Sequence, residues 1–224
     1  MPTCPICGAT GPFEPKHSIC QFTKTPIGRL SCPGCNVIFG PLDMISMSLE
    51  QMNEEYERLY SSYSEGDTTE YETSTFMSLP PIQGKTYLNF GAGRWSRTTK
   101  NLKAAGYDVT AYDPFVSSEW VSSDSSVLER KYDGIFSHNV IEHLQDPVGT
   151  FRQMASMLKP SGTMAHSTAC YEYRYEYSKY HLFFYLGRSP EILSSITGFE
   201  ICGGEKNNSG GGYIRKNFLL RKKP

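Results

Sequence analysis

The stretch KTYLNFGAGRWSRTTKNLKAAGYDVTAYDP, residues 85–114, constrains the fold more than any other part of the chain. An apolar run leads into a glycine-rich turn, then into a segment of helical character and a second apolar run that ends at Asp113. Asp113 lies 20 residues after Gly93, roughly the distance at which a βαβ unit brings a carboxylate to a ribose. The spacing therefore predicts a half-fold that binds a nucleoside.

The glycine-rich turn also indicates what kind of nucleoside binds there. Gly91 and Gly93 allow a tight turn and a close approach of the backbone to a ligand. A dinucleotide site favours a further small residue where the helix opens, but this chain continues with Arg94, Trp95 and Ser96. The turn therefore favours a ligand without phosphates.

Two blocks of sequence are together specific enough to indicate a family. The first is LNFGAG followed by VTAYDP, and the second is YDGIFSHNVIEHLQDPVGTFRQMASMLKPSGTMAHST, residues 132–168. In this combination they resemble the class I S-adenosylmethionine (SAM) dependent methyltransferases, from about Gly84 to the C-terminus. The resemblance implies an α/β, Rossmann-like fold with a mostly parallel sheet and helices on both faces, and it implies SAM as the cofactor.

The resemblance also implies which residues contact the cofactor. They are Asn89, Phe90, Gly91, Ala92, Gly93, Asp113 for the ribose, and Asn139. The family usually carries an acidic residue in place of Asn89, so polar contacts to the amino-acid end of SAM are weakened. It often carries a small residue in place of Trp95, and the indole could either crowd the turn or cover the ligand. Only 19 residues separate Asp113 from Asp133, which is short for a helix plus a strand, so residues 117–126 give no clear adenine contact.

Methyl transfer to a hydroxyl group requires alignment of the acceptor and removal of a proton. The resemblance places His143 near the acceptor, although a helix-capping or core imidazole is the alternative interpretation. Related ubiquinone-pathway enzymes carry Glu-x-x-Glu-His here and are thought to hold a divalent ion, but Asn139 replaces the first glutamate. A second candidate base is His181, within ACYEYRYEYSKYHLFFYLG, residues 169–187, where this family commonly builds its acceptor pocket. Imidazole titrates near neutrality, which suits either histidine.

Four of the seven cysteines form two C-x-x-C pairs near the N-terminus, Cys4 with Cys7 and Cys32 with Cys35. Such knuckles turn backbone amides toward thiolates, and two of them complete a tetrahedral Zn²⁺ site. A closed shell of four cysteines has no open coordination position, so the predicted zinc is structural rather than catalytic. His17 and Cys20 lie between the pairs, and either could replace one ligand, but four cysteines already suffice. Cys20 is interpreted as a packing residue.

The sequence predicts three regions: a zinc ribbon at residues 1–40, a helical arm or linker at 41–83, and a methyltransferase domain at 84–224. Within the arm, apolar residues recur at helical spacing after Ser48, a candidate N-cap, so the arm packs on the main sheet and its tyrosines could cover the cofactor. The predicted strands are 86–90, 108–112, 132–137, 163–167, 199–202 and 213–220. Helices are expected to begin at Pro147 and at Ser189–Pro190.

The charge balance bears on the partner. With 22 basic and 23 acidic side chains, the chain lacks the basic surplus of a phosphate-neutralising protein, which argues against nucleic acid. No apolar run reaches the length of about 18 residues that a membrane span needs, and the N-terminus lacks a secretion signal, so we expect a cytoplasmic protein without a membrane partner.

Three functions remain open from the sequence. The first is a methyltransferase acting on a small polar acceptor, most simply a hydroxyl of a sugar, because chains with this zinc ribbon and EHLxDP block resemble enzymes of bacterial polysaccharide and sugar modification. The second is an RNA methyltransferase that uses the ribbon for RNA recognition. The third is a non-catalytic SAM-binding zinc scaffold. The acceptor and the oligomeric state are not specified by the sequence.

Overall fold

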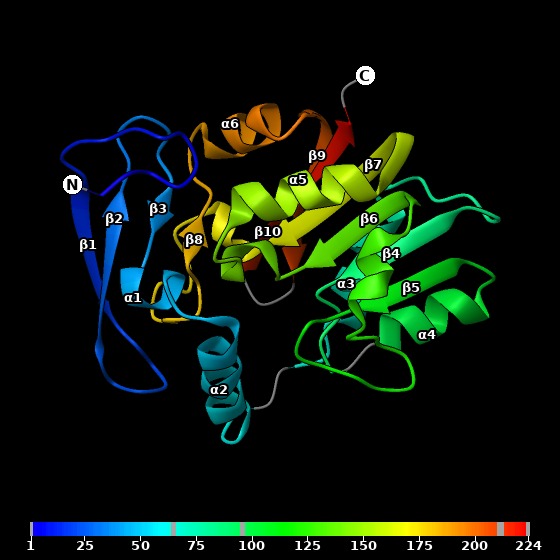
Figure 1. Ribbon diagram of the computed structural model, residues 1–224, viewed down its shortest axis with the longest axis horizontal. Coiled ribbons are helices and arrows are strands. Elements are labelled where there is room, and N and C mark those ends of the chain that lie inside the picture. The colour runs from blue at the N-terminus through cyan, green and yellow to red at the C-terminus, as the bar shows by residue number, and fades with distance from the viewer. Residues whose placement is uncertain (1, 64–65, 95–96, 210–212, 223–224) are drawn as a thin grey trace.

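The computed structural model describes residues 2–63, 66–94, 97–209 and 213–222, which form two sheets flanked by helices (Figure 1). The larger sheet has the order β5-β4-β6-β7-β10-β9. Its strands are β4 (Thr86–Phe90), β5 (Asp108–Tyr112), β6 (Tyr132–His138), β7 (Leu158–Thr168), β9 (Phe199–Ser209) and β10 (Tyr213–Lys222).

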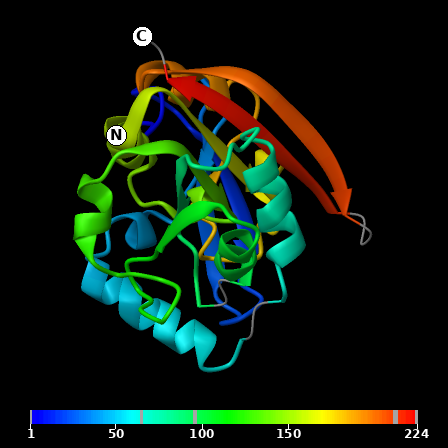
Figure 2. The same cartoon turned by 90° about the vertical axis from the view of Figure 1, so that its right-hand side faces the viewer.

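Pairing within the larger sheet is mainly parallel. Strand β4 pairs in parallel with β5 and β6, and β6 pairs in parallel with β7. Strand β10 runs antiparallel to both of its neighbours, β7 and β9. Figure 2 shows the β9–β10 hairpin reaching away from the rest of the molecule, because β10 pairs with β7 only over Lys216–Arg221. The predicted α/β fold with a mostly parallel sheet is confirmed.

Alternate residues of the central strands face two separate layers of helices. Helices α3 (Thr69–Met77) and α4 (Arg97–Ala104) cover one face, where Phe76 packs with Tyr87 and Phe136. Helices α5 (Pro147–Met157) and α6 (Ser189–Ile196) cover the other face, where Phe151 packs with Leu88 and Ile135. This alternation is what a strand period of two dictates for a sheet buried on both sides.

The helix starts follow the signals in the sequence. Asp146 caps α5 through a hydrogen bond from the Gly149 amide (2.8 Å), with Pro147 in the first turn. Ser48 and Gln51 form a reciprocal capping box at the start of α2 (Leu49–Tyr60), which follows the short helix α1 (Leu42–Ile45). Strand β7 begins at Leu158, earlier than the predicted residue 163, because Leu158 pairs with Tyr132 across the sheet.

The short connection between β5 and β6 holds no full helix and strand among its described residues. It contains an isolated parallel bridge between Tyr112 and Ser122 and the 3-10 helix η1 (Ser125–Glu129). The sheet therefore ends at β5 on this side. Two further 3-10 helices, η2 (Ile141–His143) and η3 (Ala169–Tyr171), follow the ends of β6 and β7.

The smaller sheet joins the N-terminus to the segment after β7. Three of its strands come from the N-terminal region: β1 (Glu14–Ile19), β2 (Pro26–Ser31) and β3 (Ile38–Phe39). The fourth, β8 (Phe183–Phe184), pairs antiparallel with β3. The ribbon is thus completed by residues that lie about 150 positions later in the chain, and Figure 1 shows β8 beside β3.

Candidate active site

The glycine turn after β4 forms a compact backbone arrangement at the carboxyl end of the sheet. The amides of Gly91 and Ala92 donate to the Tyr112 carbonyl at 2.8 and 3.0 Å. Gly91 has φ +71°, and a Cβ there would lie 2.6 Å from a Val140 methyl group, so only glycine fits between the two loops. Gly93 also has positive φ (+63°), but among the described residues other than its chain neighbours no atom lies within 4 Å of the position that a Cβ would take there.

Asp113 is fixed beside this turn. One carboxylate oxygen accepts a hydrogen bond from the Gly93 amide (3.0 Å), and the other accepts one from the Phe115 amide (2.9 Å). A carboxylate has about four lone-pair sites and is a suitable acceptor for ribose hydroxyls. The residues predicted to form the floor of the cofactor site, Gly91 and Gly93, and its predicted ribose ligand therefore lie together.

Three other predicted cofactor residues use their side chains within the protein. Asn89 is buried under the turn, and its amide donates to Glu72 (3.5 Å) and Thr99 (3.4 Å). The Phe90 ring packs on Tyr112 with ring centroids 5.8 Å apart. Ala92 packs in a small apolar cluster with Ala111 and Val121. Trp95, whose indole was predicted to crowd the turn or cover the ligand, lies outside the described residues.

Asn139 follows the carboxyl end of β6 at the same edge of the sheet. Its φ of +52° is unusual for a residue other than glycine, and its backbone N–H donates to the Ser167 carbonyl (2.8 Å). The same serine bonds the His138 imidazole through its hydroxyl (2.6 Å), and that ring stacks on Tyr71 of α3. Glu72 and Tyr71 thus bring α3 to the site, a contribution that sequence reasoning missed.

The two histidines predicted to be catalytic lie next to each other, with ring centroids 5.1 Å apart. His143 Nδ1 is 2.8 Å from the Tyr180 carbonyl, and His181 Nδ1 is 3.1 Å from the Tyr175 carbonyl. A carbonyl oxygen can only accept, so Nδ1 of each ring carries a proton, and Nε2 is the ring atom that can take up or release a second one. Burial, together with His143, lowers the pKa of His181 well below its usual value, so His181 is neutral at pH 7.

A group of buried polar side chains surrounds His181. Glu142 accepts a hydrogen bond from the Thr168 hydroxyl (2.5 Å), and the Cys170 sulfur lies 3.6 Å from His181 Nδ1. A carboxylate oxygen of Glu142, the Cys170 sulfur and a ring nitrogen of His181 lie within 4.8 Å of one another. Burial and the neighbouring Glu142 raise the pKa of the Cys170 thiol, which is therefore protonated at neutral pH.

Helix α2 adds an aromatic wall that connects the cofactor edge to the histidines. The Tyr56 ring lies 5.6 Å from the Phe115 ring, 6.3 Å from His143 and 5.6 Å from Tyr180, measured between ring centroids. The Phe115 backbone amide donates to Asp113, so Phe115 and Tyr56 together link the predicted ribose ligand to the predicted base. The arm was expected to pack on the main sheet, and the apolar spacing that includes Tyr56 was its signal in the sequence.

Three further contacts hold this wall in place. Lys179 forms an ion pair with Glu55 of α2 (2.5 Å), and the Tyr180 hydroxyl donates to the Glu55 carbonyl (3.4 Å). The Arg94 guanidinium lies 5.3 Å from the centroid of the Tyr60 ring, one turn further along α2. Burial and Glu55 raise the pKa of Tyr180 to about 12, so its phenol remains protonated at neutral pH.

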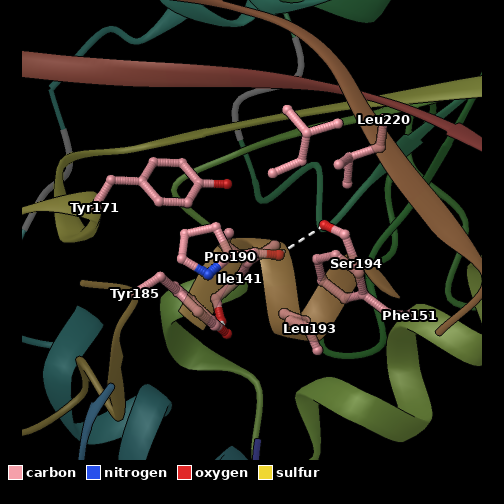
Figure 3. A pocket seen from close by; sticks show the side chains of 9 residues that line it. Ile141, Phe151, Tyr171, Tyr185, Pro190, Leu193, Ser194 and Leu220 are labelled. Atoms are coloured by element: carbon pink, nitrogen blue, oxygen red, sulfur yellow. Dashed lines mark hydrogen bonds between the residues drawn. The ribbon is translucent and has the colours of Figure 1, made fainter. Parts of the chain in front are cut away.

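A small cavity lies apart from these residues, between α5, α6 and the sheet (Figure 3). It is lined mainly by apolar groups such as Ile141, Phe151 and Leu193, together with Tyr171 and Tyr185. Its volume of about 10 Å³ is about what a single water molecule needs. It is a packing defect of the core, not a ligand site.

The four predicted zinc ligands also lie together. Cys4 and Cys35 sulfurs are 3.7 Å apart, Cys7 and Cys32 sulfurs are 3.6 Å apart, and all four lie within 4.8 Å of one another. Zinc–sulfur bonds of about 2.3 Å give a tetrahedron with edges of about 3.8 Å, so the four sulfurs fit Zn²⁺. A hydrogen bond from Cys35 lowers the pKa of Cys4 to about 5, which places a thiolate in the cluster.

Comparisons with known proteins agree with this geometry. The model of a family described as a methyltransferase domain matches residues 54–202, more than half of the chain. No curated protein matches the chain. None of the described helices is long and apolar enough to cross a membrane.

Several solved structures are similar in fold. One is 1,6-didemethyltoxoflavin-N1-methyltransferase from Burkholderia thailandensis, at 15% identity over 94% of this chain and 100% of that one, with a TM-score of 0.59. Another is magnesium protoporphyrin IX methyltransferase from Synechocystis PCC 6803, at 13% identity over 78% and 97%, with a TM-score of 0.55. A third is a mitomycin 7-O-methyltransferase, at 16% identity over 79% and 61%, also with a TM-score of 0.55.

Proposed function

The chain belongs to the methyltransferase-domain family and is a SAM-dependent methyltransferase, and from this premise we propose that it methylates a hydroxyl group of a sugar or a related small polar metabolite. The observation that carries the proposal is the pair of neighbouring imidazoles, His143 and His181, of which His143 is linked to the Asp113 turn through the rings of Tyr56 and Phe115. This arrangement provides a binding turn for a nucleoside and a proton acceptor, linked by aromatic side chains.

The cofactor end of the proposal rests on the turn after β4. Asp113 accepts hydrogen bonds from the ribose hydroxyls, and the nucleoside lies beside Gly93, where no described atom beyond the chain neighbours is within 4 Å of a Cβ position. Asn139, at the end of β6, lies on the same edge as the turn. Bound SAM supplies an electrophilic methyl group on a sulfonium.

The acceptor end rests on the histidines. His143 Nε2 takes the proton of the acceptor hydroxyl while that oxygen forms a bond to the methyl carbon and the carbon–sulfur bond breaks. His181, neutral because its pKa is lowered by burial and by His143, orients the acceptor or serves as the base in place of His143. The aromatic wall, which includes Tyr56 and Tyr180, excludes water from the reacting atoms.

A small acceptor agrees with the surroundings of the site. The wall combines aromatic faces with polar tips, including Tyr56, Tyr180 and the Lys179–Glu55 pair, a mixture that suits a sugar better than an apolar metabolite. The similar structures are named for a toxoflavin precursor, magnesium protoporphyrin IX and mitomycin, which are all small molecules. The nearly balanced charge of the chain gives an RNA acceptor no support.

We also propose that the four-cysteine cluster holds one structural Zn²⁺. The distances between sulfurs fit a tetrahedral site, and knuckle amides such as those of Ile6 and Cys7 bond the Cys4 sulfur and stabilise its thiolate. All four positions are filled by protein ligands, so the metal has no part in methyl transfer.

The function is tested with the zinc-loaded chain of 224 residues. Calorimetry with S-adenosylhomocysteine should detect one binding site per chain. A panel of nucleotide-sugars is then incubated with SAM carrying a radiolabelled methyl group, and we expect label in at least one sugar. Label that appears only in RNA, or in no acceptor despite tight cofactor binding, would contradict the proposed acceptor class.

A further inference from the structure

Arg29 of β2 is an unusual residue for the interior of a small ribbon. Its side chain is 2% exposed, which is rare for a guanidinium. In the described part of the chain, its hydrogen bonds end on neutral oxygens rather than on a carboxylate. Burial lowers the pKa of Arg29, but a guanidinium remains charged at neutral pH.

The guanidinium connects the ribbon to the residues that carry His181. Its Nη1 donates to the Glu176 carbonyl (2.7 Å), and its Nη2 donates to the carbonyls of Ser178 (2.7 Å) and His181 (3.1 Å). On the ribbon side, Nε donates to the Gly40 carbonyl (3.2 Å). One planar guanidinium thus binds three carbonyls of the 175–182 segment. The compact ammonium of a lysine can reproduce this pattern only in part, because its donors all lie on one nitrogen atom.

Neighbouring contacts reinforce this junction. The Ser18 hydroxyl donates to the Glu176 carbonyl (2.7 Å), and the amides of Gln21 and Gly40 donate to the carbonyls of Tyr177 (2.8 Å) and Leu182 (3.0 Å). The Arg29 guanidinium also lies over the ring of Phe184 in β8, 5.0 Å from its centroid. A Cβ at Gly40 would lie 2.9 Å from the Gly28 carbonyl oxygen, so the close approach of the chain at this junction requires glycine.

The opposite side of the same segment faces the candidate active site. The Tyr180 carbonyl accepts from His143, the Leu182 amide donates to the Glu142 carbonyl, and the His181 ring lies against His143. The 175–182 segment is therefore held between the ribbon and the catalytic residues. A displacement on the ribbon side moves the imidazole on the other side.

We infer that Arg29 is a positioning residue, and that the zinc ribbon serves the methyltransferase site by holding the 175–182 segment, with His181, in place for the acceptor. The assignment of the acceptor to this side rests on the proposed function. The ribbon touches neither the Asp113 turn nor the glycines in any described contact, so its influence is on the acceptor side and not on the cofactor side.

The test compares Arg29→Met and Arg29→Lys with wild-type protein. Arg188→Met is the matched control, because Arg188 also donates to a ribbon carbonyl, that of Gly34 (3.2 Å), but does so away from the 175–182 segment. We expect Arg29→Met to increase amide hydrogen exchange at Ser178, His181 and Leu182 by about tenfold or more, with little change in β4 and β6. Affinity for S-adenosylhomocysteine should stay within about threefold of wild type.

The specific signature is the imidazole spectrum of His181, assigned by its loss in His181→Gln. Arg29→Met should shift these signals, Arg29→Lys should restore them in part, and Arg188→Met should leave them unchanged. The signals of His166, buried in β7, serve as the internal control, since a general loss of stability would not move His181 alone.

If Arg29→Met does not fold, Ser18→Ala removes one hydrogen bond of the same junction and should give a smaller shift in the same direction. Unchanged His181 signals and exchange rates in both Arg29→Met and Ser18→Ala would overturn the positioning role. Wild-type protein that binds no S-adenosylhomocysteine would instead contradict the proposed function, and the His181 comparison would still decide the role of Arg29.

Discussion

The side chain of Asp113 has two roles. Its carboxylate accepts the amides of Gly93 and Phe115, and it is the predicted ligand of the ribose. The first role places the carboxylate at the rim of the glycine turn, and the second uses the capacity of a carboxylate to accept about four hydrogen bonds. Replacement of this side chain therefore affects both the shape of the turn and its affinity for a nucleoside.

We expect Asp113→Ala to weaken SAM binding by about 10- to 100-fold, because two hydrogen bonds worth about 1–3 kcal/mol in total are lost. Isothermal calorimetry with S-adenosylhomocysteine measures the change. Asp108→Ala is the control, because Asp108 is exposed at the opposite end of the same strand and should leave the dissociation constant unchanged. Equal affinities of wild type and Asp113→Ala would remove the ribose assignment.

A second prediction concerns the effect of the two histidines on turnover. His143→Gln and His181→Gln should each reduce turnover, by about 100-fold or more for the residue that acts as the base, and leave cofactor affinity nearly intact. The measurement is methyl transfer under saturating SAM with the acceptor found in the sugar screen. His17→Gln, an exposed change in β1, should be fully active. Full activity in both site variants would show that neither imidazole is the base.

At the element scale, Asp133 joins the first residues of three parallel strands. It accepts from the Thr86 amide (2.9 Å) in β4 and from Lys159 (2.7 Å) in β7, while belonging to β6 itself. Desolvation opposes ionisation, but the hydrogen bonds from Lys159 and Thr86 prevail and hold the pKa of Asp133 well below its usual range. The ionised carboxylate thus stabilises the alignment of the strands.

Because the folded-state pKa of Asp133 is depressed, its contribution to stability is present above the ordinary carboxyl pKa of about 4 and is lost as the pH falls through the folded-state value. Asp133→Asn should therefore lower the free energy of unfolding at pH 7 by about 1–2 kcal/mol, with a smaller difference below about pH 4. Urea unfolding at several pH values measures this. In a double-mutant cycle with Lys159→Met the two losses should not add, and strict additivity would contradict the pairing.

At the scale of the whole molecule, the ribbon and the methyltransferase domain share a sheet. Strand β8 belongs to the segment after β7, but it pairs with β3 of the ribbon. The predicted boundaries at residues 40 and 83 separate stretches of sequence, whereas this pairing joins two of those stretches in space. The proposed zinc site would therefore stabilise more than the N-terminal residues that form it.

Metal analysis of the purified protein should find about one zinc per chain. Cys4→Ser should lose the metal and lower the melting temperature, and amide exchange should rise in the ribbon and at residues 175–184 because β8 and Arg29 depend on the ribbon. Cys202→Ser, at an exposed cysteine, should retain both metal and stability. A metal-free protein with wild-type stability would rule out the zinc ribbon.

Local sequence patterns determined much of the fold. Alternating apolar runs specified the strands of the larger sheet, and capping residues specified where α2 and α5 begin, because both signals act over a few neighbouring residues. The C-x-x-C knuckles and the glycine turn were readable for the same reason, since each is formed within a short stretch of chain. The family was indicated by the resemblance of two sequence blocks, LNFGAG with VTAYDP and residues 132–168, to known methyltransferases.

Only the tertiary structure decided which distant residues meet. Arg29 carries no local signal, yet its partners lie about 150 residues later, in the segment that holds His181. Tyr56 was part of a helical apolar stripe, but nothing local indicated that it would lie between Phe115 and His143. The sequence by itself therefore determined the elements and their chemistry. The packing of elements far apart in the chain decided how the ribbon, the arm and the histidines come together. Such contacts depend on shape and burial, which no short stretch of sequence contains.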